Sequence, residues 1–280
     1  MLRTPTLEDE LGDILEKALK LSGLREDQLA SLAGVEAGRI KDALDYRYDL
    51  SSSDLRRLAE ALALNEPGLR ALAEGRYPQP ETPALPFCLH MIAMPYGVGV
   101  VNAYLLRLCD SPDAILIDSG ACSRALREAW PGQVSGLQAH LVTHWGTDHA
   151  GGCIETMSRF GLEYCFGPGP ARAGTRVLGE AEVIEIGAFQ IEVVSTPGPS
   201  REHYCYRAGL KRQPGSRSVL FTGDLIFCGS IGGGFFDTSA VLAHARRLWQ
   251  TLPGDTVVAP GHGPLTTIEN EREFNPFSRG

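Results

Sequence analysis

One ten-residue stretch carries more structural and chemical information than any other part of this chain. It reads Thr143-His144-Trp145-Gly146-Thr147-Asp148-His149-Ala150-Gly151-Gly152. The apolar pair Leu141 and Val142 precedes it, and a helical pattern over residues 153–160 follows it. We therefore expect a strand-to-helix loop that presents two imidazoles and a carboxylate side by side. Groups of this kind, held close together, suit a divalent metal ion.

Two later loops have the same design. Asp224 follows the apolar run 219–221, and His262 follows the apolar run 257–259. Glycines beside both residues allow the backbone to turn sharply and to approach other groups closely. We expect Asp224 and His262 to be further metal ligands.

The region that contains these loops alternates between two kinds of pattern. Strand-like runs cover 98–108, 114–118, 141–143, 183–186, 189–195, 219–222 and 256–259. Helical patterns cover 123–130, 153–160 and 241–252. Strands interleaved with helices predict a layered α/β or α+β domain.

The first part of the chain has a different texture. Apolar residues recur at helical spacing in five short segments before residue 74, which predicts a small all-α domain. Residues 75–86 then contain four prolines, which is typical of a stiff, extended linker. We expect an all-α domain over 1–74, a linker over 75–86 and an α+β domain over 87–280. We also expect the last domain to remain folded when residues 1–80 are removed.

Composition excludes several classes of protein. The chain has 280 residues, 43% of them hydrophobic, and a formal net charge of −8, so nothing attracts it as a whole to nucleic acid or to an anionic membrane. The acidic N-terminus does not resemble a secretory signal, and no apolar run is long enough to cross a membrane. Seven scattered cysteines without a Cys-x-x-Cys pair favour reduced thiols in a cytoplasmic protein.

Taken in order, the motifs over 86–280 resemble the metallo-β-lactamase fold, which is a four-layer αββα sandwich. The most similar branch is the glyoxalase II-like hydroxyacylglutathione hydrolases. The resemblance also includes Asn102-Ala103-Tyr104-Leu105-Leu106, Leu116-Ile117-Asp118-Ser119-Gly120 and the tail from Thr266 to Phe277. Each motif is weak alone, but all of them in this order are specific.

Two family histidines are missing from this chain. The family pattern His-x-His-x-Asp-His has Gly146 at its second histidine, and the family's Thr-Pro-Gly-His ends here in Pro199. The resemblance therefore implies that the first of two metal positions keeps only His144 and Asp224. The second position keeps all of its ligands, which are Asp148, His149, Asp224 and His262. Because two protein groups rarely hold a divalent ion, we expect one metal ion, either zinc or, as alternatives, iron or manganese.

The function implied by the resemblance is hydrolysis of an ester, thioester or lactone in a small-molecule substrate, through a metal-bound hydroxide. Asp148 and His144 are the expected catalytic residues. His203, four residues after Pro199, corresponds to a position where the family often has a histidine that is not a ligand; the weaker alternative is that His203 replaces the missing ligand. Two alternatives remain: a non-catalytic ligand sensor on a degenerate fold, and a mononuclear iron sulfur dioxygenase. The dioxygenase uses the first metal position, which Pro199 deprives of a ligand.

The N-terminal part resembles the repressor-like (Cro/C1-type) helix-turn-helix domains. Residues 26–35 match the first helix and turn, and residues 36–46 correspond to the recognition helix. Residues 1–80 nevertheless hold 11 Lys and Arg against 15 Asp and Glu. Since DNA binding draws much of its affinity from phosphate neutralisation, DNA is possible but not favoured as a partner. We expect a dimerisation or docking role and a homo-oligomer.

Overall fold

The computed structural model describes residues 6–47, 49–97, 99–170 and 172–279, and its first part is helical. The helices there are α1 (Leu11–Ser22), α2 (Glu26–Ala33), α3 (Ala37–Leu44), α4 (Ser52–Ala61) and α5 (Glu66–Ala73). Local chemistry starts α4: Ser51 Oγ accepts a hydrogen bond from the Asp54 amide, and the Asp54 carboxylate accepts one from the Ser51 amide. This reciprocal cap satisfies two amides that the helix itself leaves without partners. No helix among the described residues is long and apolar enough to span a lipid bilayer.

Two mixed β-sheets form the centre of the remaining described chain. The first sheet has the order β1 (Cys88–Tyr96), β2 (Gly99–Arg107), β3 (Asp113–Ile117), β4 (Gly136–Leu141), β5 (Cys165–Gly167) and β6 (Thr175–Val177). The second has the order β14 (Thr266–Thr267), β13 (Val257–Pro260), β10 (Val219–Gly223), β9 (Tyr204–Leu210), β8 (Phe189–Ser195) and β7 (Val183–Ile186). A small hairpin of β11 (Ile226–Phe227) and β12 (Ser230–Ile231) follows β10.

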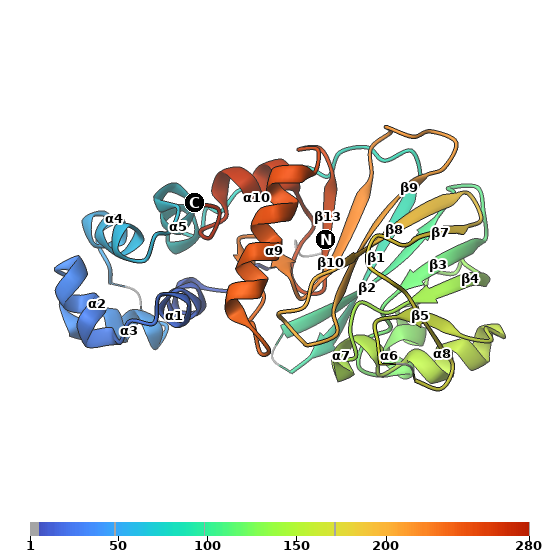
Figure 1. Ribbon diagram of the computed structural model, residues 1–280, viewed down its shortest axis with the longest axis horizontal. Helices are drawn as coiled ribbons and strands as arrows, with labels where there is room; N and C mark the ends of the chain where they lie inside the picture. Colours follow the sequence, from blue (N-terminus) through green and yellow to red (C-terminus); the bar gives the residue numbers. More distant parts are fainter. Residues whose placement is uncertain (1–5, 48, 98, 171, 280) are drawn as a thin grey trace.

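The sheets pack face to face, and helices cover their outer faces (Figure 1). One apolar cluster joins the inner faces, including Leu106 and Ile117 of the first sheet and Val193 and Phe221 of the second. The first sheet is covered by α6 (Ser123–Glu128), α7 (Thr147–Ala150) and α8 (Cys153–Phe160). The second is covered by α9 (Thr238–Thr251) and α10 (Ile268–Phe274). This is the expected four-layer αββα arrangement.

The helical part does not stand apart, because α1 packs against α9 and α5 packs against α10 (Figure 1). Ile14 and Leu69 share one buried apolar cluster with Leu248 and Trp249 of α9. The proline-rich segment is also attached, because Tyr77 is buried and its hydroxyl donates to Glu271 Oε2 at 3.1 Å. The expectation that the last domain remains folded without residues 1–80 did not take this shared core into account, and it remains a prediction. The boundaries at 74 and 87 remain a prediction.

The cysteines depart from the expectation of uniformly reduced thiols. Cys88 and Cys109 form a disulfide, with their Cα atoms 5.0 Å apart. The antiparallel register of β1 and β2 pairs Cys88 with Arg107, which brings the two thiols together. The other five cysteines, all within the described part of the chain, are free.

Parallel strand pairs place the functional loops at one edge. β4 lies parallel to β3, and β13 lies parallel to β10. Each of β4, β10 and β13 is followed within a few residues by a predicted ligand. The carboxyl ends of these strands therefore present the three loops together.

Candidate metal centre

The structure brings all five predicted ligands into one cluster. Two triads satisfy metal-ligand spacing, and His149 belongs to both; they are His144, His149 and Asp224, and Asp148, His149 and His262. The Nε2 atom of His149 lies 3.1 Å from Asp224 Oδ1 and 3.8 Å from Asp148 Oδ2. His262 Nε2 lies 3.5 Å from each of the same two oxygens. Ligand bonds of about 2.1 Å around one tetrahedral ion separate neighbouring ligand atoms by about 3.4 Å, so this spacing fits a single ion.

Asp224 connects the two halves of the cluster. Its Oδ1 atom faces His149 and His262, whereas its Oδ2 atom lies 3.5 Å from His144 Nε2. His144 therefore lies on the side of Asp224 that corresponds to the depleted first position. The structure places it near the cluster and opposite Asp148.

Asp118 orients His149 from behind, a role that the sequence reasoning did not assign. Its Oδ2 atom accepts a hydrogen bond from His149 Nδ1 at 2.8 Å, which leaves Nε2 facing the cluster. The Asp118 carboxylate also accepts from the amide and the hydroxyl of Thr143, each at 2.8 Å. A carboxylate behind a histidine fixes the tautomer and raises the basicity of the nitrogen that faces the metal. The signal for it was the Leu-Ile-Asp-Ser-Gly motif.

A backbone carbonyl orients His262 in the same way. Its Nδ1 atom donates to Val100 O at 2.7 Å, so its Nε2 atom also faces the cluster. The loop that carries His262 is held from β2, where Asn102 donates to Gly263 O at 2.8 Å and Tyr104 donates to Pro260 O at 2.7 Å. The Asn-Ala-Tyr motif thus serves to position the third ligand loop.

His203 is buried beside His144 but is occupied by other groups. Its Nδ1 atom shares a 2.8 Å hydrogen bond with Thr196 Oγ1, and its Nε2 atom accepts from the Asp224 amide at 3.2 Å. Burial, and next the nearby His144, hold the pKa of His203 well below its usual value, so the ring is neutral. His203 therefore positions the Asp224 backbone, in line with its expected non-ligand role.

The cluster attracts positive charge. Burial alone would raise the pKa of Asp224, but the charges of His149 and His144 outweigh burial and lower that pKa far below the usual range. Burial would lower the pKa of His149, yet the carboxylates of Asp224 and Asp118 hold that pKa well above its ordinary value.

Two buried atoms at the centre have no hydrogen-bond partner among the described residues: His149 Nε2 and Asp224 Oδ1. Such atoms are costly to bury unless something else satisfies them. Gly261 leaves space at this point, since a Cβ there would lie 2.5 Å from His149 Cε1 and 2.9 Å from Asp224 Oδ1. The donor set, the two unpartnered atoms and the space beside them fit a divalent cation.

The two missing histidines have different surroundings. A Cβ on Gly146 would lie 2.7 Å from His144 Nε2 and 2.8 Å from Asp148 Oδ1, so any side chain at 146 projects into the cluster. Pro199 is buried and packs beside Gly232, in the segment that follows Asp224. The absence of a side chain at 146 thus allows His144 and Asp148 to approach this point closely.

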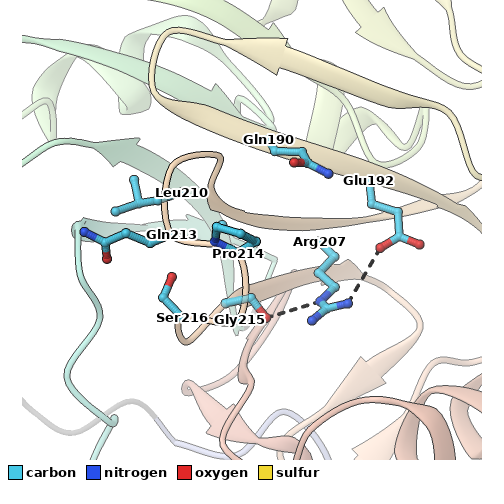
Figure 2. Close-up of a pocket in the computed structure, with 10 residues that line it drawn as sticks. Gln190, Glu192, Arg207, Leu210, Gln213, Pro214, Gly215 and Ser216 are labelled. Carbon is cyan, nitrogen blue, oxygen red and sulfur yellow. Dashed lines mark hydrogen bonds and ion pairs between the residues drawn. The ribbon is translucent and has the colours of Figure 1, made fainter.

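Figure 2 shows a pocket at the other end of the second sheet. It has a volume of about 180 Å³ and is crossed by the ion pair of Arg207 with Glu192, whose charged atoms are 3.8 Å apart. Ser218, in its lining, immediately precedes β10, whereas Asp224 follows the same strand. The pocket is therefore separate from the metal centre.

Several known proteins are similar to this chain. A probable hydroxyacylglutathione hydrolase of Schizosaccharomyces pombe is 29% identical over 178 residues, covering 61% of this chain and 68% of its own length. A hydroxyacylglutathione hydrolase of Haemophilus influenzae is 27% identical over 193 residues, covering 60% and 88%. A solved protein in a di-iron-bound form is 27% identical with a TM-score of 0.52, covering 66% of this chain and 98% of that one.

A solved B3 metallo-β-lactamase, BLEG-1, is 30% identical with a TM-score of 0.57, and the match covers 69% of this chain and all of that one. The family model of the metallo-beta-lactamase superfamily matches residues 96–262, which include every predicted ligand. This protein therefore belongs to the metallo-β-lactamase superfamily.

Proposed function

We propose that this protein is a hydrolase with a single divalent metal ion, zinc in the first instance, held by Asp148, His149, Asp224 and His262. The observation that carries the proposal is the convergence of these four side chains, in which Nε2 of His149 and Nε2 of His262 lie 3.1 to 3.8 Å from oxygens of Asp148 and Asp224. Such an ion, when bound, supplies the Lewis acidity that acidifies a water and polarises a carbonyl. Side chains of the protein perform the remaining steps.

Asp148 is the proposed general base. Its Oδ2 atom faces His149 and His262, whereas its Oδ1 atom and His144 Nε2 both lie close to Gly146. Oδ1 can therefore accept a proton from a water at the centre, and His144 Nε2 can orient that water. Burial, and next the hydrogen bond from His262 and the charge of His149, set the pKa of Asp148; its partners prevail and keep that pKa below normal. Asp148 is therefore a carboxylate at neutral pH.

The proposed substrate is a thioester, with esters and lactones as related possibilities. The support comes from relatives named as hydroxyacylglutathione hydrolases, which match this chain at 27–29% identity. A sulfur dioxygenase is disfavoured, since Pro199 occupies a position where that chemistry uses a ligand. A solved ETHE1 protein of Myxococcus xanthus is 23% identical, and that likeness extends to the fold alone.

For helices α1–α5 we propose a docking role rather than DNA recognition. Two arginines at the expected recognition helix are paired with acids of the same segment. Arg39 pairs with Asp49 and Asp54, and Arg47 pairs with two further aspartates within five residues. Arginines that are already paired with acids contribute little positive charge to the neutralisation of DNA phosphates. Homo-oligomerisation remains a prediction.

The test is hydrolysis of a hydroxyacylglutathione thioester by the purified protein before and after chelation. We expect turnover that disappears with the metal, returns with one equivalent of zinc and is lost in Asp224→Asn. The matched control is His90→Ala, which removes a partly exposed histidine of β1 far along the chain from the ligands. A protein that binds zinc but hydrolyses no thioester, ester or lactone supports the sensor alternative instead.

A further inference from the structure

The segment before α1 lies against the metal centre, although it is far from the ligand loops in sequence. Gly263, which directly follows the ligand His262, faces it: a Cβ on Gly263 would lie 3.3 Å from the Glu8 amide nitrogen and 3.8 Å from Thr6 O. A Cβ on Gly99, at the start of β2, would likewise lie 3.9 Å from Glu8 Oε2. Residues 6–10 therefore run between the β2 start and the third ligand loop.

Polar contacts anchor this segment to the hairpin that follows Asp224. The carboxylate of Asp9 pairs with Lys17 of α1 and accepts a hydrogen bond from Ser230 of β12. Lys17 Nζ also donates to Ile231 O at 2.7 Å. Lys20, one turn later, donates to Gly234 O at 3.2 Å. Because Lys17 and Asp9 are largely buried, with side chains 15% and 11% exposed, the anchor is held away from solvent.

The anchored segment points an acid at the back of one ligand. Glu8 Oε1 lies 3.8 Å from Nδ1 of His262, on the side of the ring opposite the cluster. That Nδ1 already donates to the neutral carbonyl of Val100. The His262 ring packs edge-on against Phe227, with centroids 5.7 Å apart, and Lys17 Nζ lies 5.6 Å from the Phe227 ring. Glu8 is thus placed toward His262 as Asp118 is placed toward His149, though at a longer distance.

We propose that Glu8 is a positioning residue for His262, which makes the N-terminal segment a structural part of the metal centre. This inference rests on the proposed metal site. A negative charge behind Nδ1–H favours the tautomer with a free Nε2 and raises the basicity of Nε2. Val100 supplies only a neutral acceptor, so Glu8 adds the charge that Asp118 gives His149. The superfamily match begins at residue 96, so Glu8 is a contribution of the N-terminal part of this chain.

The experiment measures metal affinity in the full-length protein by chelator competition, with zinc and with cobalt as probes. In Glu8→Gln we expect affinity to fall by about tenfold, the lower end of the range for such partners, because Val100 still holds the ring. The matched control is Glu16→Gln, which removes the same charge from an exposed position of α1. We expect its affinity to equal that of the wild type. Glu8→Asp, which keeps the charge, should retain more affinity than Glu8→Gln.

The visible absorption of the cobalt form separates positioning from simple stability. We expect Glu8→Gln to change that spectrum, whereas Glu16→Gln leaves it unchanged and both apo proteins melt at similar temperatures. If Glu8→Gln does not fold, Lys17→Met tests the same contact, since it releases the segment and keeps Glu8; affinity should fall there too. Equal affinities and spectra in wild type and Glu8→Gln overturn this inference alone. A wild-type protein that binds neither metal overturns the proposed function with it.

Discussion

Asp118 Oδ2 accepts a hydrogen bond of 2.8 Å from His149 Nδ1, linking the end of the third strand of the first sheet to the first ligand loop. Both oxygens of Asp118 are acceptors, because Oδ1 receives the Thr143 amide at 2.8 Å. The carboxylate therefore fixes the His149 tautomer and the loop backbone at once. The metal centre depends on this buried acid as much as on the ligands themselves.

Asp118→Asn should weaken zinc binding by roughly 10- to 100-fold. Either orientation of the amide directs a donor toward a donor, at His149 Nδ1–H or at the Thr143 amide. When the amide nitrogen faces His149, the ring takes the tautomer that carries its hydrogen on Nε2, where the metal must bind. Chelator competition measures the loss, and Asp110→Asn, an exposed residue in the turn after β2, is the control. Unchanged affinity in Asp118→Asn would show that the tautomer is fixed by something else.

Removing the buried His140 should reduce the loss of unfolding free energy that occurs as the pH falls. Burial lowers the pKa of His140 from its usual 6.5 to about 4. The folded state therefore keeps His140 neutral while the unfolded chain takes up a proton below pH 6.5. Its contribution is intact above pH 6.5 and is lost as the pH falls to 4, by on the order of 3 kcal/mol.

His140→Leu should therefore show a smaller loss of unfolding free energy between pH 6.5 and pH 4 than the wild type. Urea denaturation of both proteins with chelator present measures the difference. The two curves should run parallel above pH 7, where neither state carries the extra proton. Parallel curves below pH 6.5 as well would contradict the assigned pKa.

Adding one methyl group at the contact between α5 and α10 should lower the stability of the protein. A Cβ on Gly68 would lie 1.7 Å from Phe274 O, so the two backbones meet directly. Gly68→Ala should cost about 1–3 kcal/mol of stability through overpacking. Gly38→Ala, in α3, meets its nearest atom at an ordinary 3.7 Å and should be neutral or stabilising by up to about 1 kcal/mol. Equal effects of the two substitutions in urea denaturation would argue against the shared core.

Patterns within short stretches of sequence predicted the N-terminal helices and the ligand loops. The helical stripes before residue 74 correspond to α1–α5, and the ligand loops carry their own signature of an apolar run followed by glycine and a ligand. The longer strands β1 and β9 were missed, as were the short strands β5, β6, β11, β12 and β14, and β4 was placed too late. β1 contains His90 and Pro95, and β9 alternates Tyr204 and Tyr206 with other groups, so neither reads as a plain apolar run.

What the sequence could not provide was contact between distant segments. Asp118, Val100 and Glu8 reach the ligand histidines from separate elements, and each pairing depends on the packing of the sheets and of α1. The Cys88–Cys109 disulfide depends in the same way on the register of β1 and β2. The spacing of residues along the chain does not show which strands pair or in which register.

The last prediction restores the missing histidines. If Gly146 and Pro199 abolish the first metal position, Gly146→His with Pro199→His should raise zinc stoichiometry from one to two per chain. The backbone at 146, with φ −55° and ψ 140°, accepts any residue. Space is tighter, because the new Cβ lies 2.7 Å from His144 Nε2, so His144 must shift slightly and some stability is lost. Titration beside Gly132→His, an exposed position with nothing within 4 Å, separates a rebuilt site from an added surface histidine. A folded double variant that still binds one ion would mean that Pro199 does not occupy the position of the family histidine.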